Sequence, residues 1–130
     1  MSTIVVVDDE ADVSRYLAAA LEDEGYTVRV ASNAEDGLAL IREVGPALVC
    51  LDLVMPGRTG MSLYRELKEI PELADLPAIV VTGVTRADAE SRLGLGRDVR
   101  APDGYIEKPV DIPQFLETVG RLAAPGRRQP

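Results

Sequence analysis

Carboxylates follow two short apolar runs of this sequence, and they are the side chains best suited to chemistry. A β-branched run near the N terminus leads into Asp8, Asp9 and Glu10, and a second run, Ala47–Leu51, leads into Asp52 before a Pro-Gly pair. Carboxylate oxygens are ligands that Mg²⁺ prefers, and a carboxylate can also form a covalent bond to a phosphoryl group. If the fold brings Asp8, Asp9 and Asp52 together, they predict a Mg²⁺ site with Asp52 as nucleophile.

A hydroxyl and an ammonium group follow two later runs. Thr82 ends the run that begins at Ala78, and Lys108 follows Tyr105–Glu107. A phosphoryl group needs a cation and a hydrogen-bond donor around it, and these side chains supply both. Taken singly, Asp52 could cap a loop, the threonine could form a turn and the lysine could lie in solvent. The occurrence of all these residues at the ends of apolar runs favours a shared site.

Composition limits the class of protein. The 130 residues suit one domain, expected at residues 1–124 with a polar tail at 125–130, and a net charge of −8 argues against direct binding to nucleic acid. The apolar runs are too short to span a membrane, so we expect a cytoplasmic protein without membrane insertion. The chain has no histidine, which excludes histidine-based catalysis and a phosphohistidine carrier role. Cys50 lies within an apolar run and is expected to be a buried structural residue.

Apolar runs alternate with segments of helical periodicity along the whole chain. We expect strands at residues 2–7, 26–30, 47–53, 78–82 and 105–109, and helices at 11–25, 34–44, from 60 through 67, 86–95 and 112–124. Asn33 is expected to cap the second helix and Gly45 to end it. Leu73 and Leu76 should pack back onto the core, while residues 94–104 contain many helix breakers and indicate a long loop.

A strand followed by a helix, repeated five times, predicts an α/β fold with a five-stranded parallel sheet and helices on both faces. For five strands we expect the flavodoxin-like order 2-1-3-4-5, in which the switch point lies between strands one and three. Asp8, Asp9 and Asp52 would then meet at that point, and Thr82 and Lys108 would arrive from strands four and five. Like charges so close together favour a bound cation such as Mg²⁺.

At this stage the chain resembles the receiver domain of response regulators in two-component signalling. The resemblance extends from about Thr3 to Ala124, in the order of elements and in the spacing of motifs. The matching segments are Val6–Glu10, Leu51–Gly57, Val81–Gly83 and Tyr105–Pro109.

The resemblance implies a role for each site residue. Asp52 would accept a phosphoryl group from a phosphohistidine of a partner histidine kinase or phosphotransfer protein. Asp9 would be a direct Mg²⁺ ligand with Asp52, Asp8 would act through water, and the backbone carbonyl of Val54 would complete the protein ligands. Lys108 would pair with Asp52 and then with the phosphoryl group.

The resemblance also implies a conformational switch made of Thr82 and Tyr105. Thr82 would move toward the phosphoryl group, Tyr105 would rotate into the space that is vacated, and a downstream protein would recognise the new surface. Two features depart from the family. The segment between these two residues is longer than usual. In the family, the positions of Val54 and Val84 flank the path of the hydrolytic water, and apolar side chains there should exclude that water, which predicts a long-lived phosphoryl group.

Three other classes remain open at the level of sequence. An aspartate-nucleophile phosphohydrolase would use similar chemistry, but it typically needs a second acid two residues after the nucleophile, where this chain has Val54. A flavodoxin-like cofactor binder would need a phosphate-binding loop after the first strand, where this chain has acids. A receiver excised from a larger regulator is the third. We expect a stand-alone switch rather than an enzyme, of unassigned oligomeric state.

Overall fold

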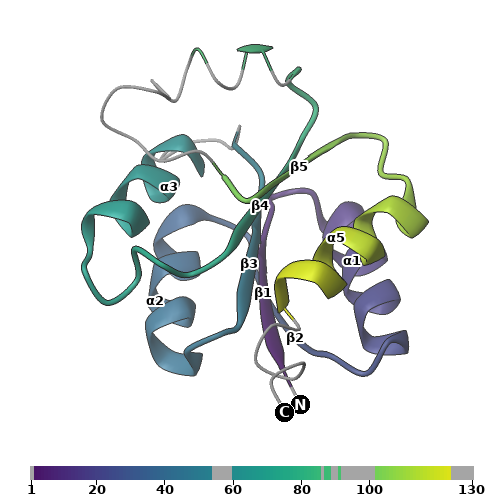
Figure 1. Ribbon diagram of the computed structural model, residues 1–130, viewed down its shortest axis with the longest axis horizontal. Helices are drawn as coiled ribbons and strands as arrows, with labels where there is room; N and C mark the ends of the chain where they lie inside the picture. The colour runs from purple at the N-terminus through teal and green to yellow at the C-terminus, as the bar shows by residue number, and fades with distance from the viewer. Residues whose placement is uncertain (1, 54–59, 86, 89–90, 92–101, 124–130) are drawn as a thin grey trace.

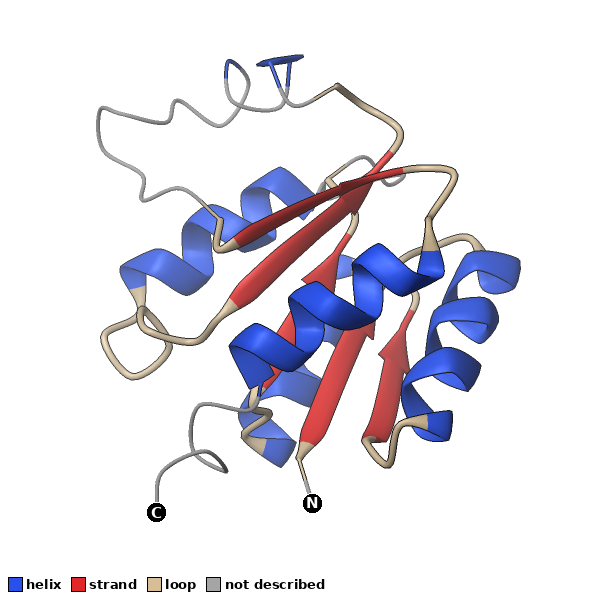
Figure 2. Cartoon of the chain, turned by 45° about the vertical axis from the view of Figure 1, so that its right-hand side comes forward, coloured by secondary structure: helices blue, strands red, loops and turns tan. Residues whose placement is uncertain are grey.

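The computed structural model describes residues 2–53, 60–85, 87–88, 91 and 102–123. Five parallel strands form one sheet, with α1 and α5 on one face and α2 and α3 on the other (Figure 1). The strand order is β2-β1-β3-β4-β5, so the predicted fold class and the predicted order are confirmed. Figure 2 shows the strands running side by side, with α5 in front of the central strands.

The bounds of the elements lie close to those predicted. The strands are β1 (Thr3–Val7), β2 (Thr27–Ala31), β3 (Leu48–Leu51), β4 (Ala78–Thr82) and β5 (Gly104–Glu107). The helices are α1 (Ala11–Asp23), α2 (Ala34–Val44), α3 (Gly60–Glu69) and α5 (Ile112–Ala123). The expected helix at 86–95 and the expected loop at 94–104 fall mostly outside the described residues.

The sheet is buried on both faces because successive residues of its central strands point to opposite sides. Val49 and Leu51 of β3 pack with α2 and α3, whereas Leu48 and Cys50 of the same strand pack with α1 and α5. Every residue of β3 and β4 is buried, which explains why their sequences are continuously apolar rather than alternating. The thiol of Cys50 is fully buried, as expected, and burial raises its pKa to about 12.

The second helix has both of the predicted end signals. The side chain of Asn33 accepts a hydrogen bond from the backbone N–H of Asp36 (2.7 Å), and Gly45 ends the helix with φ of 57°. Leu73 and Leu76 pack on the core as expected. Their loop is held by Lys68, whose Nζ donates hydrogen bonds to the carbonyls of Ala74 and Leu76, both at 3.1 Å.

The structure corrects the expected start of the fifth strand. The sequence predicts a loop at Gly104, but this residue pairs with Ile79 in the β4–β5 ladder. A Cβ at this position would lie 2.9 Å from Cγ2 of Thr118 in α5, so glycine allows the helix to approach the strand closely. Along the chain, a glycine between a proline-containing loop and an aromatic residue favours a turn. The pairing of Gly104 with Ile79 depends instead on the close packing of α5.

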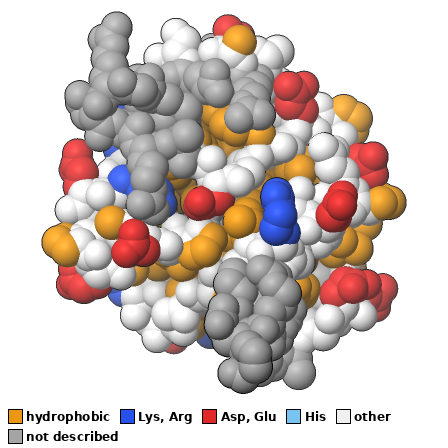
Figure 3. Space-filling model, viewed as in Figure 1, with side chains coloured by type: hydrophobic (Ala, Val, Ile, Leu, Met, Phe, Trp, Pro, Cys, Tyr) orange, Lys and Arg blue, Asp and Glu red, His pale blue; other side chains and the backbone are white. Residues whose placement is uncertain are grey.

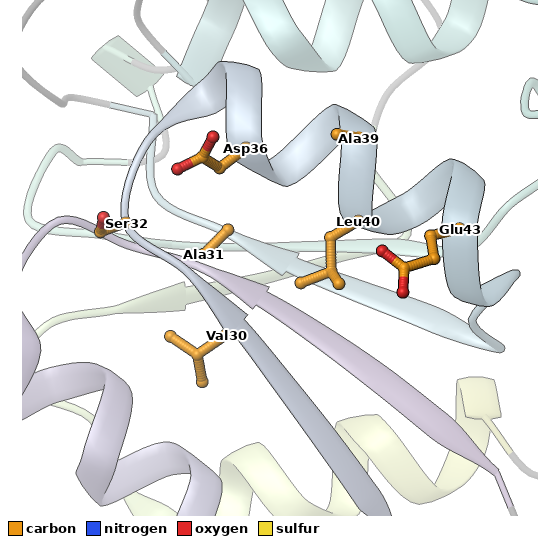
Figure 4. Close-up of a pocket in the computed structure, with 7 residues that line it drawn as sticks. All are labelled: Val30, Ala31, Ser32, Asp36, Ala39, Leu40 and Glu43. Carbon is orange, nitrogen blue, oxygen red and sulfur yellow. The ribbon is translucent and has the colours of Figure 1, made fainter.

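The edge strand β2 is the most exposed of the sheet, with a mixed burial pattern and Val30 46% exposed. A shallow hollow of about 340 Å³ lies between β2 and α2, and Figure 4 shows Asp36, Leu40 and Glu43 of the helix around it. None of the predicted site residues is among its described lining residues.

Acidic side chains are spread around the rim of the molecule on the face seen in Figure 3. Within the described residues, every helix is too short or too polar to cross a membrane.

A methyl group added at Gly60 should destabilise the fold. Its Cβ would overlap the backbone carbonyl of Asp52, which cannot move without shifting β3. We expect Gly60→Ala to lower the free energy of unfolding by about 3 kcal/mol or more. Gly120→Ala is the matched control, because nothing lies within 4 Å of its Cβ position in α5, and it should stabilise the protein by about 0.5–1 kcal/mol. Urea denaturation measures both, and equal effects of the two variants would contradict this packing.

Candidate functional site

Two acids are held at the carboxyl ends of β1 and β3, at the switch point of the sheet. The backbone N–H of Asp8 donates to the carbonyl of Ala31 (3.1 Å), and that of Asp52 donates to the carbonyl of Val7 (3.0 Å). These bonds continue the strand ladders by one residue. Both carboxylates are therefore fixed to the sheet, with only 2% and 5% of each residue exposed.

Lys108 arrives from the end of β5 and joins these acids. Its backbone N–H donates to the carbonyl of Thr82 (2.9 Å). Its Nζ lies 2.9 Å from Oδ2 of Asp52, 3.1 Å from Oδ2 of Asp8 and 2.6 Å from Oε1 of Glu10. The lysine side chain is 15% exposed and the Glu10 side chain 59%, so Glu10 lies at the open side of the cluster. The predicted pairing of Lys108 with Asp52 is thus present as a contact.

The cluster holds more negative than positive charge. Three carboxylates surround one ammonium group, which leaves a formal charge of −2. Burial is the largest influence on Asp8 and raises the pKa of its carboxyl, against hydrogen bonds from the backbone of Glu10 and from Lys108. Burial alone would lower the pKa of Lys108, but hydrogen bonds to Glu10, Asp52 and Asp8 outweigh it and raise that pKa.

The same acids form a possible metal site. One carboxylate oxygen from each of Asp8, Glu10 and Asp52 lies within 4.8 Å of the others. Oδ2 of Asp8 is buried, and its partner within the described part of the chain is the ammonium group of Lys108, which it shares with Asp52 and Glu10. A hard cation fits this set, because it would satisfy that oxygen and cancel the excess negative charge.

This group differs from the set inferred from the sequence. Asp9 is exposed and is not part of the group, so its role as a metal ligand stays a prediction, and Val54 lies outside the described residues. Glu10 is not among the site residues predicted from the sequence. A signal for it is the two-residue period of an extended chain, which places the side chains of residues 8 and 10 on the same side where the chain leaves β1.

A short turn completes this arrangement. The backbone N–H of Glu10 donates to Oδ1 of Asp8 (2.9 Å), as in an Asx turn. The hydroxyl of Ser14, also unpredicted and 2% exposed, donates to the carbonyl of Asp8 (3.2 Å). Asp8 is therefore held through its backbone and its side chain by the first turn of α1, which explains the close approach of Glu10 to Lys108.

The two predicted switch residues lie on neighbouring strands. Thr82 ends β4 and is fully buried, and its Oγ1 accepts a hydrogen bond from the backbone N–H of Val84 (3.3 Å). Tyr105 is half-buried on β5, pairs with Val80, and packs against the core cluster that contains Tyr64. In the sheet order β4 is next to β3 and β5 is next to β4, but the roles of Thr82 and Tyr105 as a switch stay predictions.

Sequence comparison decides the family. The model of the response regulator receiver domain matches residues 4–120, which is most of the chain. The chain belongs to the response regulator receiver family. The resemblance stated from the motifs is confirmed by this match.

Relatives of this receiver domain include single-domain and longer proteins. Protein PilH of Pseudomonas aeruginosa is 37% identical over 124 residues, which cover 95% of this chain and 99% of that protein. The phosphate regulon transcriptional regulatory protein PhoB of the same organism is 39% identical over 126 residues, and the receiver domain spans 52% of its length.

Two solved structures of other receiver domains have a similar fold. The signal receiver domain of a signal transduction histidine kinase from Syntrophus aciditrophicus superimposes with a TM-score of 0.85 and 26% identity, covering 100% of this chain and 96% of that one. A CheY-like response regulator receiver domain protein from Methanospirillum hungatei gives 0.83 and 27%, covering 100% and 99%. The fold is thus shared over the full receiver domain.

Removing the ammonium group should expose the repulsion among the buried acids. We expect Lys108→Met to lower the free energy of unfolding by about 1–3 kcal/mol in a buffer with chelator, less than for a fully buried pair because the lysine is partly exposed. Arg15→Met is the control, since Arg15 and Asp12 form a solvent-exposed ion pair that should contribute less than about 0.5 kcal/mol. Chemical denaturation measures both variants. A loss no larger than that of the control would show that Lys108 does not balance the cluster.

Proposed function

We propose that this receiver domain is a phosphorylation-controlled signalling switch with Asp52 as the phosphoryl acceptor. The observation that carries the proposal is the position of Asp52 at the end of β3, 2.9 Å from Lys108 and within the same acid group as Asp8. A nucleophilic carboxylate, a cation for the phosphoryl oxygens and acids for a metal are thereby within reach of one point.

Mg²⁺ is the cofactor that suits this donor set. Asp8 and Asp52 would hold it together with Asp9, and the backbone carbonyl of Val54 is the remaining predicted ligand. When bound, the ion neutralises the carboxylates and the incoming phosphoryl oxygens, so that an anionic donor can approach. Oxygen ligands and a small crevice favour Mg²⁺ over softer metals.

The reaction is a transfer of one phosphoryl group. A carboxylate oxygen of Asp52 attacks phosphorus, the phosphorus–nitrogen bond of the donor phosphohistidine breaks, and the electron pair of that bond stays on the histidine nitrogen of the partner, which takes up a proton from solvent. The phosphohistidine belongs to a separate protein, because this chain has no histidine. That donor is a histidine kinase or a phosphotransfer protein. Lys108 keeps the attacking carboxylate in place and then pairs with the oxygens of the new acyl phosphate.

Thr82 converts this local event into a conformational change. Its hydroxyl now accepts the N–H of Val84, and it would instead donate to a phosphoryl oxygen. That exchange releases the start of the loop after β4 and lets Tyr105 rotate inward, which changes the surface of β5 and α5. A phosphorylated Asp52 would thus shift a population toward a state recognised by a downstream protein, with no nucleic acid or membrane required.

An aspartate-nucleophile phosphohydrolase is the competing function. It would use Asp52 in the same way but would also need an acid two residues later to activate water, and this position is Val54. The chain would therefore hold its phosphoryl group rather than turn over a substrate, and we assign it no steady enzymatic activity.

Intact mass measurement tests the acceptor. After incubation with Mg²⁺ and acetyl phosphate, we expect a mass increase of one phosphoryl group, which is lost with excess chelator and in Asp52→Asn. Asp23→Asn is the matched control, because Asp23 is an exposed residue at the opposite end of α1. It should be labelled like the wild type. Labelling that persists in Asp52→Asn would refute the assignment, and steady release of phosphate would favour the hydrolase.

The lifetime of the phosphoryl group tests the role of Val84. This residue is half-buried and packs on the core next to Thr82, so it offers an attacking water no hydrogen bond from its side chain. We expect Val84→Asn to speed the decay of phosphorylated Asp52 several-fold after the donor is removed, measured by intact mass over time. Val28→Asn, a half-buried valine of β2, should decay like the wild type. Equal lifetimes in all three proteins would contradict the role of Val84.

A further inference from the structure

Glu10 makes the shortest contact of Lys108 and is its most exposed partner. Oε1 of Glu10 lies 2.6 Å from Nζ, against 2.9 Å for Asp52 and 3.1 Å for Asp8. The Glu10 side chain is 59% exposed, whereas those of Asp8 and Asp52 are 2% and 6% exposed. One side of the ammonium group therefore faces buried acids, and its open side is covered by a carboxylate that solvent can reach.

The backbone of Glu10 is anchored while its side chain is left without a role in the helix. Its N–H donates to Asp8, and its carbonyl accepts the N–H of Ser14 in the first turn of α1. Glu10 is the N-cap residue of this helix, but its side chain makes no capping hydrogen bond and instead reaches a lysine 98 residues later in the chain. A carboxylate on a fixed backbone with an exposed side chain can leave Lys108 by rotation alone.

From these contacts we infer that Glu10 is a built-in competitor of the phosphoryl group. Its carboxylate occupies the open side of Lys108, which an oxygen of phosphorylated Asp52 must reach, and its charge opposes an anionic donor. Phosphorylation would displace Glu10 into solvent, and Glu10 would restrain phosphorylation until then. The inference rests on the proposed role of Asp52 and adds a positioning residue that acts through Lys108.

The charge of the crevice sets the direction of the effect. Three carboxylates contact one ammonium group, so the loss of the Glu10 charge makes the crevice more positive by one unit, whether or not Mg²⁺ is bound. A more positive crevice raises the attraction for a dianion more than for a monoanion. A partly exposed ion pair is worth about 0.5–1 kcal/mol, which corresponds to a change of about 2–5-fold in an equilibrium or rate constant.

The experiment compares Glu10→Gln with Glu22→Gln, an exposed residue near the other end of α1 that has the same side chain. Labelling rates of Asp52 are measured by intact mass at saturating Mg²⁺ with dianionic acetyl phosphate and with monoanionic phosphoramidate. We expect Glu10→Gln to be labelled about 2–5-fold faster by acetyl phosphate, with a smaller gain for phosphoramidate, and the gain should shrink as salt is added. Glu22→Gln should match the wild type.

A second measurement separates the contact from the charge. Beryllofluoride is a phosphoryl analogue that binds an acceptor carboxylate, and its affinity in the presence of Mg²⁺ is measured by titration. Glu10→Asp keeps the charge but is one methylene group shorter, so it should lose the contact with Lys108 and bind beryllofluoride more tightly than the wild type, as Glu10→Gln does. Thermal melts confirm that each variant is folded.

The outcomes distinguish the two proposals. A wild-type protein that takes up no phosphoryl group on Asp52 would overturn the proposed function and this inference with it. Labelling of the wild type with no gain in Glu10→Gln, or with the same gain for both donors, would overturn the inference alone. A wild-type affinity for beryllofluoride in Glu10→Asp would overturn the contact as its cause.

Discussion

The balance of charge around Lys108 is the constraint on which the site depends. One ammonium group is shared by Asp8, Asp52 and Glu10, and the first two carboxylates are almost completely buried. Buried acids of this kind are tolerated only when a cation lies among them, and a single lysine cannot neutralise three. The crevice therefore keeps an excess of negative charge, which a divalent ion can neutralise. A site that is incompletely neutralised by its own residues can respond to the arrival of a metal and an anion.

Parallel topology makes this concentration of charge possible. At the switch point between β1 and β3, the two flanking helices lie on opposite faces of the sheet, so both strands end in an open crevice. The fully apolar strands behind the crevice supply the stability that the acids do not. Close packing also reaches the site directly, because Gly60 at the start of α3 lies against the carbonyl of Asp52. A site held by backbone bonds on rigid strands can keep carboxylates near one another without rearranging.

The route from this site to the protein surface is short. Thr82 is buried at the end of β4, and its carbonyl accepts the backbone N–H of Lys108, the residue that follows β5. Tyr105 lies on β5, three residues before Lys108, and packs on the opposite side of the sheet from α5. A change at the crevice therefore meets a buried hydroxyl, a backbone hydrogen bond and a half-buried aromatic ring within two adjacent strands. Family membership makes signalling the natural use of such an arrangement.

The sequence by itself determined the fold class, the order of strands, the capped second helix and the convergence of Asp8, Asp52 and Lys108. These follow from local patterns, since apolar runs bounded by turn residues define buried strands, and parallel topology then brings their carboxyl ends together. Only the tertiary structure decided that Gly104 belongs to β5, because this depends on the approach of Thr118 in α5. It also decided that Glu10 contacts Lys108. Glu10 is an exposed, charged residue at the start of a helix, and the two-residue period that places it on the same side as Asp8 does not indicate a contact with a lysine 98 residues away. Contacts between charged side chains depend on rotamers and distances that periodicity does not encode, so this part of the site could be found only in three dimensions.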